Sequence, residues 1–102
     1  MSYWPQSNHR RMNDKPRIRI YGSDYCGYCV AAKMLLDRKG VRYEDIPVDA
    51  DADLRLRIAE QSGSRTIPQI FIDDVPIGGF DELNTMNMNG ELDRMLAPNE
   101  NA

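Results

Sequence analysis

Two cysteines, Cys26 and Cys29, stand three positions apart in a chain of 102 residues. This spacing suits disulfide exchange, because one thiolate can attack a sulfur and the second thiol can then close an internal bridge. A bridge across so short a loop would constrain little of the unfolded chain, so it would add little stability. The pair therefore favours redox chemistry over a structural disulfide.

The cysteine pair lies between a predicted strand and a predicted helix. Residues 17–21 alternate polar and apolar side chains, which is typical of a strand, and apolar residues recur at helical spacing over residues 27–39. The first turn of a helix has unpaired N–H groups and favours negative charge. We therefore predict that Cys26 is the acidic, attacking thiol, and that the more covered Cys29 resolves the mixed disulfide.

Two other interpretations of the cysteines stay open at this point. Both residues could be small apolar side chains in the core. They could also be two of the roughly four ligands of a zinc site. Against zinc, the only histidine is His9, which falls in a polar segment at the N-terminus.

A second candidate element is Pro68, which comes directly before the apolar segment 69–72. This segment predicts a short buried strand. A cis bond between Ile67 and Pro68 would turn the N–H and C=O of Ile67 outward, where they could pair with an extended peptide. The alternative is the commoner trans bond, with Pro68 as an ordinary strand start.

A third candidate element is the glycine pair Gly78 and Gly79, which precedes a predicted helix starting at Phe80. The N–H groups at a helix start can hold a carboxylate, and Asp81 in the first turn could pair with an ammonium group. The alternative is a plain turn, in which Asp81 only stabilises the helix dipole.

The remaining pattern predicts an α/β fold with a four-stranded mixed sheet flanked by helices on both faces. In the first helix the apolar spacing comes from Val30, Met34 and Leu35, and in the second strand Tyr43 and Ile46 are expected to be buried. Strands are predicted at residues 17–21, 41–48, 69–72 and 75–77, and helices at residues 27–39, 54–63, 80–88 and 91–96.

The composition is that of one globular domain, with 41% apolar residues, 28% charged residues and a net charge of −3. It gives no reason to expect nucleic acid or a membrane as a partner, since there is no basic stripe and no long apolar run. Residues 1–15 predict a flexible tail that lacks the apolar core of a signal peptide. Residues 16–97 are the expected domain, residues 98–102 a C-terminal tail, and the reducing cytoplasm the expected location.

Taken together, these segments resemble the glutaredoxin family. The resemblance covers about residues 17–96 and rests on Cys-Gly-Tyr-Cys, Thr-Ile-Pro-Gln-Ile-Phe-Ile-Asp, Ile-Gly-Gly-Phe-Asp-Glu-Leu and their spacing. It implies a thioredoxin-like fold and the cis form of the bond before Pro68. It also implies a glutathione-dependent thiol–disulfide oxidoreductase that reduces protein–glutathione mixed disulfides and protein disulfides.

The resemblance further implies a groove that binds glutathione. The backbone of Ile67 would pair with its cysteinyl part, and the N-terminus of the helix at Phe80 and Asp81 would hold its γ-glutamyl end. Arg55 would face the glycine carboxylate, and Tyr28 would line the groove beside the sulfur. The full implied set is Tyr28, Arg55, Thr66, Ile67, Pro68, Gly79, Phe80 and Asp81.

The chain departs from the family pattern at two positions. Ser23 stands where many members carry a lysine, which predicts weaker thiol acidity and weaker glutathione binding, and Gly27 stands where proline is common. Some members with Gly or Ser there resemble this chain and hold an iron–sulfur cluster across a dimer. A 2Fe–2S cluster ligated by Cys26 and glutathione is therefore the alternative function. Otherwise we expect a monomer without metal, whose partners are glutathione and glutathionylated or disulfide-containing proteins.

Overall fold

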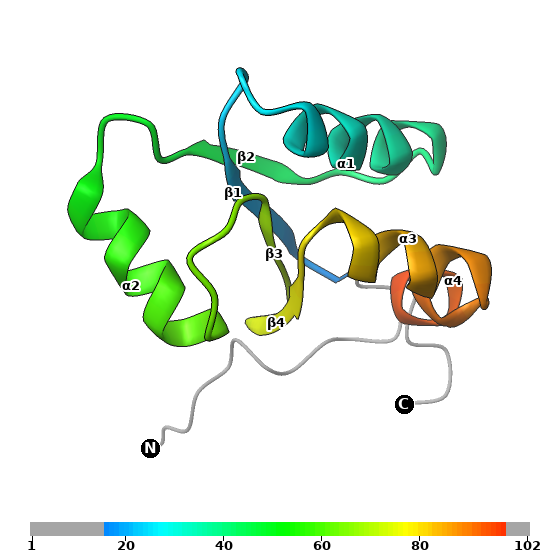
Figure 1. Cartoon of the computed structure of the whole chain (residues 1–102). Helices are drawn as coiled ribbons and strands as arrows, with labels where there is room; N and C mark the ends of the chain where they lie inside the picture. The colour runs from blue at the N-terminus through cyan, green and yellow to red at the C-terminus, as the bar shows by residue number, and fades with distance from the viewer. Residues whose placement is uncertain (1–15, 98–102) are drawn as a thin grey trace, which may run out of the picture.

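The computed structural model describes residues 16–97, and the two predicted tails lie outside the described residues. The described part is a sheet with helices on both faces (Figure 1). The elements in chain order are β1 (Ile18–Gly22), α1 (Gly27–Arg38), β2 (Glu44–Pro47), α2 (Ala52–Ser62), β3 (Gln69–Ile72), β4 (Val75–Gly78), α3 (Phe80–Met88) and α4 (Glu91–Leu96). The predicted α/β class and element order are confirmed.

The sheet has four strands in the order β2-β1-β3-β4. β1 pairs in parallel with β2 and antiparallel with β3, and β3 pairs antiparallel with β4, so the sheet is mixed as predicted. β3 is buried along its whole length, which explains its continuous apolar sequence. β4 lies at an edge, where a strand tolerates Pro76 because one side of its backbone needs no ladder hydrogen bond.

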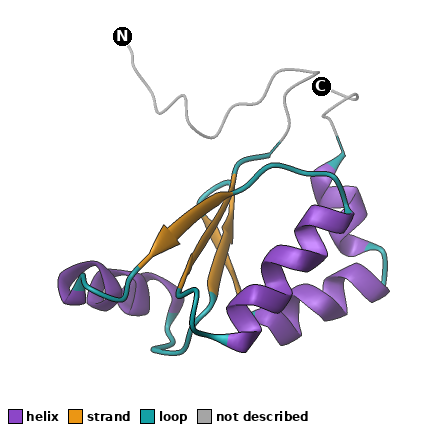
Figure 2. Cartoon of the chain, turned by 90° about the horizontal axis from the view of Figure 1, so that it is seen from above, coloured by secondary structure: helices purple, strands orange, loops and turns teal. Residues whose placement is uncertain are grey.

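Two hydrophobic clusters attach the helices to the two faces of the sheet. α1, α3 and α4 cover one face, while α2 lies alone on the other (Figures 1 and 2). The larger cluster, under α1, α3 and α4, consists of Ile18, Ile20, Ala32, Leu35, Leu36, Ile70, Ile72, Leu83, Leu92 and Leu96. The smaller cluster, under α2, consists of Tyr21, Val48, Ile58 and Phe71. Successive residues of β1 and β3 thus feed opposite clusters, as the period of a strand requires.

The connections follow from local chemistry. The Asp51 carboxylate accepts a hydrogen bond of 3.0 Å from the N–H of Leu54 and caps the start of α2. α2 is followed by Gly63, close to its predicted end, and the φ of 80° at this glycine is the left-handed conformation that commonly terminates a helix. Asp73 and Asp74 both have positive φ and join β3 to β4 in a tight turn, a conformation that aspartate tolerates better than most residues.

Two details of the sequence prediction are wrong. The second strand covers only Glu44–Pro47, because only these residues pair with β1, and Tyr43 and Ile46 are half-buried rather than buried. On α1 the buried face is Cys29, Ala32, Leu35 and Leu36, whereas Val30 and Met34 are 40% and 47% exposed. The helix is therefore rotated relative to its apolar pattern, which leaves two apolar side chains at the surface.

We predict that Leu36→Ala lowers the free energy of unfolding by about 2–5 kcal/mol, because the fully buried side chain leaves a cavity under α1. Urea denaturation followed by circular dichroism measures this loss. The matched control is Leu56→Ala on α2, where the side chain is 56% exposed and the change should stay within about 0.5 kcal/mol. Equal losses in the two variants would contradict the described core.

Candidate active site

Cys26 occupies the N-cap position of α1, at the end of the loop that leaves β1. Burial acts to raise the pKa of its thiol. The N–H groups of Cys29 and Tyr28 and the thiol of Cys29 donate hydrogen bonds to the sulfur, and together they lower the pKa of Cys26 below the ordinary value. The Cys26 thiolate is therefore stabilised by the first turn of the helix, as the sequence predicted.

Cys29 has the opposite environment. Its side chain is fully buried, and burial raises the pKa of its thiol to about 11. The N–H of Ser23 lies 3.5 Å from its sulfur and donates to it, while the neighbouring Cys26 disfavours a second negative charge. The two thiols therefore differ in acidity: the pKa of Cys26 is lowered and that of Cys29 is raised.

The space for the Cys29 sulfur depends on Gly22, a residue that the sequence analysis did not single out. A Cβ atom built on Gly22 would lie 2.6 Å from the sulfur of Cys29, closer than nonbonded atoms approach. The glycine at the end of β1 therefore lets the helix sit close to the strand. The signal in the sequence was only a glycine at a strand end, which does not reveal what lies opposite.

The turn before β3 lies against the cysteine pair. The Ile67–Pro68 peptide bond is cis, as the family resemblance implied. The thiol of Cys26 lies 3.8 Å from the carbonyl oxygen of Ile67. Gln69, which is almost fully buried, donates from Nε2 to the Thr66 carbonyl at 2.8 Å and fixes the turn. Gln69 is a second supporting residue that the sequence analysis did not assign to the site.

The glycine pair before α3 is arranged differently from the simplest expectation. The N–H of Gly79 donates to the Glu82 carboxylate at 2.7 Å, so this donor is already occupied. The N–H groups of Phe80 and Asp81 belong to the first turn of α3 and have no partner within the helix. The donors that α3 offers to a carboxylate are therefore those of Phe80 and Asp81.

Two adjoining cavities bring the predicted residues together. One, of about 380 Å³, is lined by Tyr28, Thr66, Ile67, Pro68, Gly79, Phe80, Asp81 and Glu82. The other, of about 310 Å³, is lined by Ser23, Tyr25, Cys26, Val48, Asp49, Arg55 and Ile67. Ile67 borders both, so they form one groove, called here the Ile67 groove, that passes the Cys26 sulfur. Every residue that the resemblance placed in a groove belongs to the lining of one of these two cavities.

Ser23 does not supply the charge that a lysine would bring to this position. Its hydroxyl bonds to the Asp49 carboxylate at 2.6 Å and accepts from the N–H of Tyr25 at 3.1 Å. Lys33 on α1 forms ion pairs with Asp24 and Asp45 at 2.9 and 3.1 Å. Its hydrogen bond to Asp24 is the main reason that the pKa of Lys33 is raised. Stabilisation of the Cys26 thiolate therefore falls mainly to hydrogen bonds from α1.

Over residues 16–97, no group of three or more His, Cys, Asp or Glu side chains is placed to hold a metal ion. Within the same residues, no helix has the length and apolar character needed to cross a membrane.

A strand-to-helix junction with one activated thiol, one buried thiol and an adjoining cis-proline turn defines a thiol–disulfide oxidoreductase. The glutaredoxin family model matches residues 18–77. The chain is 42% identical over 82 residues to a glutaredoxin of Pseudomonas aeruginosa, covering 80% of this chain and 98% of the relative. It is 43% identical over 79 residues to glutaredoxin 3 of Escherichia coli K12, covering 78% and 95%. The chain belongs to the glutaredoxin family.

A solved structure gives the same result for the fold. The crystal structure of a buckwheat glutaredoxin–glutathione complex superposes with a TM-score of 0.74 at 33% identity, covering 79% of this chain and 76% of that one. The thioredoxin-like fold expected from the sequence is therefore confirmed, and the protein is a thiol–disulfide oxidoreductase of this family.

We predict that iodoacetamide alkylates Cys26 with a pH midpoint lower than that of a free cysteine thiol. The thiolate fraction rises as pH passes the pKa, so a lowered pKa moves the rate curve to lower pH. Cys29 should stay unreactive until the pH approaches 11. Mass spectrometry of peptides after timed alkylation measures both sites.

The matched variants are Cys29→Ser and Cys29→Ala. Serine keeps a hydrogen-bond donor for the Cys26 sulfur and should leave the midpoint close to the original one, whereas alanine removes the donor and should raise it. The same midpoint in both variants would show that the Cys29 thiol has no part in stabilising the Cys26 thiolate.

Proposed function

We propose that glutathione is the co-substrate and that protein–glutathione mixed disulfides are the main substrates. The Cys26 thiolate attacks the glutathione sulfur, the substrate protein leaves as a thiolate, and Cys26 carries the glutathione. A second glutathione thiolate then attacks the sulfur of the bound glutathione. This step releases glutathione disulfide and restores the Cys26 thiolate.

The observation that carries this proposal is the complementarity of the Ile67 groove to glutathione. The tripeptide has two carboxylates and one ammonium group. At one end the N–H groups of Phe80 and Asp81 suit the γ-glutamyl carboxylate, and the Asp81 side chain suits the ammonium group. At the other end Arg55 suits the glycine carboxylate. The backbone of Ile67 lies between the two ends, next to the Cys26 sulfur.

Support also comes from the buckwheat protein, which was crystallised as a glutaredoxin–glutathione complex and shares 33% identity with this chain. Glutaredoxins have potentials near about −200 to −230 mV, within reach of a cytosolic glutathione pool. We accordingly propose the cytoplasm as the site of action, and a monomer as the active form.

For a substrate that is a protein disulfide, the second cysteine has a role. Cys26 attacks one sulfur and forms a mixed disulfide with the substrate. Cys29 then loses its proton and attacks the sulfur of Cys26, which frees the reduced substrate and leaves an internal Cys26–Cys29 bridge. Two glutathione molecules reduce this bridge and leave as glutathione disulfide.

A second proposal, a 2Fe–2S cluster shared by two chains, is kept on one observation. Gly27 is exposed beside Cys26, and a Cβ built there would have nothing within 4 Å, so the surface is open to a second chain. The buried Cys29 cannot reach a shared cluster. Cys26 of each chain and one glutathione per chain would then supply the four thiolate ligands.

We predict that Cys26→Ser abolishes reduction of a glutathione mixed disulfide, because it removes the thiol whose pKa is lowered. Cys29→Ser should keep much of this activity but lose reduction of protein disulfides, which requires the internal bridge. The measurement is NADPH oxidation coupled through glutathione and glutathione reductase. Activity retained by Cys26→Ser would overturn the assignment of the nucleophile.

Two experiments test the dependence on glutathione: one changes the residue proposed to bind its ammonium group, and the other changes the reductant. Asp81→Asn should raise the KM for the mixed disulfide roughly tenfold, equivalent to about 1.4 kcal/mol, by removing the partner of the ammonium group. The matched control is Asp53→Asn, which also removes a first-turn helix carboxylate but lies on α2. Equal activity with thioredoxin reductase in place of glutathione would overturn the proposal.

The cluster proposal has its own test. Anaerobic reconstitution with iron, sulfide and glutathione should give a coloured dimer in the original chain and a colourless monomer in Cys26→Ser. The readouts are the visible spectrum and sedimentation velocity. A colourless monomer from the original chain would eliminate the cluster and leave the reductase proposal intact.

A further inference from the structure

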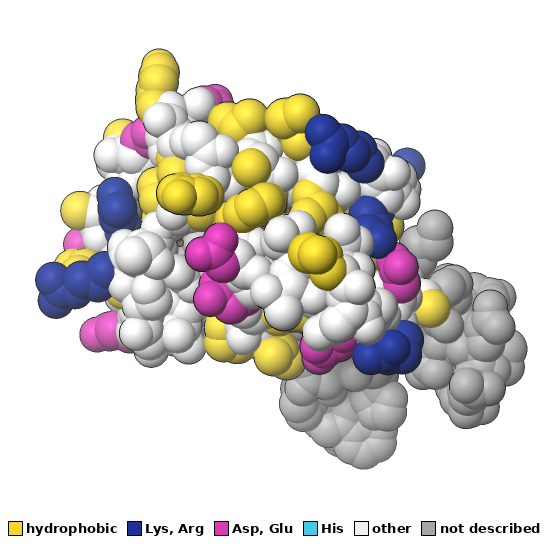
Figure 3. All heavy atoms as spheres, turned by 45° about the vertical axis from the view of Figure 1, so that its right-hand side comes forward, with side chains coloured by type: hydrophobic (Ala, Val, Ile, Leu, Met, Phe, Trp, Pro, Cys, Tyr) yellow, Lys and Arg dark blue, Asp and Glu magenta, His cyan; other side chains and the backbone are white. Residues whose placement is uncertain are grey.

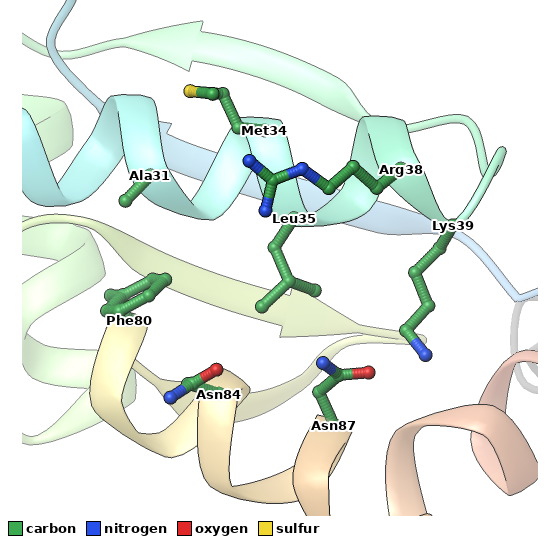
Figure 4. A pocket seen from close by; sticks show the side chains of 8 residues that line it. All are labelled: Ala31, Met34, Leu35, Arg38, Lys39, Phe80, Asn84 and Asn87. Carbon is green, nitrogen blue, oxygen red and sulfur yellow. The ribbon is translucent and has the colours of Figure 1, made fainter.

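A groove separate from the Ile67 groove runs between α1 and α3. Figure 4 shows side chains from the two helices facing each other across it. Its cavity volume is about 540 Å³, larger than either part of the Ile67 groove. The lining residues are Ala31, Met34, Leu35, Arg38, Lys39, Phe80, Asn84 and Asn87. None of them except Phe80 has a place in the proposed glutathione chemistry.

The α1–α3 groove adjoins the part of the Ile67 groove that Tyr28 and Phe80 line. Phe80 lines both the α1–α3 groove and the glutathione cavity, and its ring lies 6.3 Å from the ring of Tyr28. Figure 3 shows hydrophobic side chains gathered across the upper part of one face, with Lys and Arg side chains on both sides of them. A substrate chain whose cysteine is bonded to the glutathione sulfur that Cys26 attacks can therefore pass over Tyr28 and into the α1–α3 groove.

The chemistry of the groove suits an extended peptide. Its apolar part comes from Ala31, Met34 and Leu35. Asn84 and Asn87 project amide groups into it from α3, as Figure 4 shows, and amides can pair with the backbone of a peptide that lacks a partner strand. A helical partner would already pair its own backbone N–H and C=O groups, so it would not need hydrogen bonds from these amides.

The far end of the groove is positively charged. Arg38 has no ion-pair partner among residues 16–97 and belongs to the lining of the groove; in Figure 4 its guanidinium group lies in front of α1, next to Leu35. Lys39 beside it is already paired with Asp93 at 2.7 Å. A carboxylate on the partner would therefore find Arg38 available, and arginine suits a carboxylate through its two parallel donors.

The distance sets where this carboxylate should be. Cys26 and Arg38 are separated by 12 helical positions, which corresponds to about 18 Å along the helix axis. An extended chain rises about 3.3 Å per residue. The carboxylate should therefore lie about five or six residues from the cysteine that reacts.

We propose that the α1–α3 groove binds an extended segment of the glutathionylated substrate protein and selects segments with an acidic residue about five or six positions from the modified cysteine. The apolar wall contacts the residues between, and Arg38 pairs with the acid. This inference rests on the proposed function, since it assumes that a mixed disulfide reacts at Cys26.

The test uses synthetic peptides with one glutathionylated cysteine. One peptide carries Glu six residues after the cysteine, one carries Glu six residues before it, and each has a partner with Gln instead of Glu. For one of the two directions, kcat/KM should be about threefold higher with Glu than with Gln, the size of a partly exposed ion pair. The advantage should shrink in high salt.

Matched variants assign the effect. Arg38→Gln should remove the preference for Glu, while Arg57→Gln, the same change on an exposed residue of α2, should keep it. Met34→Asn should lower kcat/KM for both peptides of the preferred pair. All three variants should reduce the mixed disulfide of glutathione and mercaptoethanol normally, because this small substrate does not reach the groove.

The outcomes distinguish a failure of peptide selection from a failure of the proposed function. If the original chain fails on the small mixed disulfide, the proposed function is wrong. If it reduces the small substrate but shows no preference for Glu in either direction, or Arg38→Gln keeps the preference, only peptide selection is overturned. Sedimentation velocity adds a last check, since a dimer of the original chain that Met34→Asn dissociates would identify a second copy as the occupant.

Discussion

The structure depends on hydrogen bonds from the start of one helix to one sulfur. The N–H groups at the first turn of α1 reach the Cys26 sulfur and outweigh the cost of its partial burial. They can do so because α1 follows directly from the central strand β1, so the helix N-terminus is fixed relative to the sheet. Among residues 16–97, no charged side chain contributes to the lowered pKa of this thiol, which relies on backbone N–H groups and the Cys29 thiol.

Burial then gives two chemically identical side chains different acidities. Cys29, three residues further along, points into the protein, where a thiolate is disfavoured. One turn of helix therefore separates a thiol with a lowered pKa, Cys26, from a thiol with a raised pKa, Cys29. The Ser23 side chain takes no part in this difference: its hydroxyl bonds to Asp49, and only its backbone N–H, which any residue would supply, donates to the Cys29 sulfur.

Sequence reasoning succeeded where the signal was local. The apolar run 69–72, the glycine that ends α2 and the position of Cys26 at a helix start all follow from neighbouring residues, and all are confirmed. It failed where distant contacts decide. Met34 is apolar and helical in spacing, yet the sheet takes the face with Leu36 instead. The close approach of Gly22 to Cys29 and the bond from Glu82 to Gly79 join residues whose proximity no local pattern predicts.

The hairpin of β3 and β4 has a consequence for recognition. Pro68 comes just before β3 and Gly79 just after β4, so the two sides of the glutathione cavity are the two ends of one hairpin. The ladder between the strands, with its irregularity at Ile70 and Phe71, sets how far apart those ends stand. Strand registry thus sets the spacing of these two ends, and a slip of one residue in the Asp73–Asp74 turn would change the shape of the cavity that Pro68 and Gly79 line.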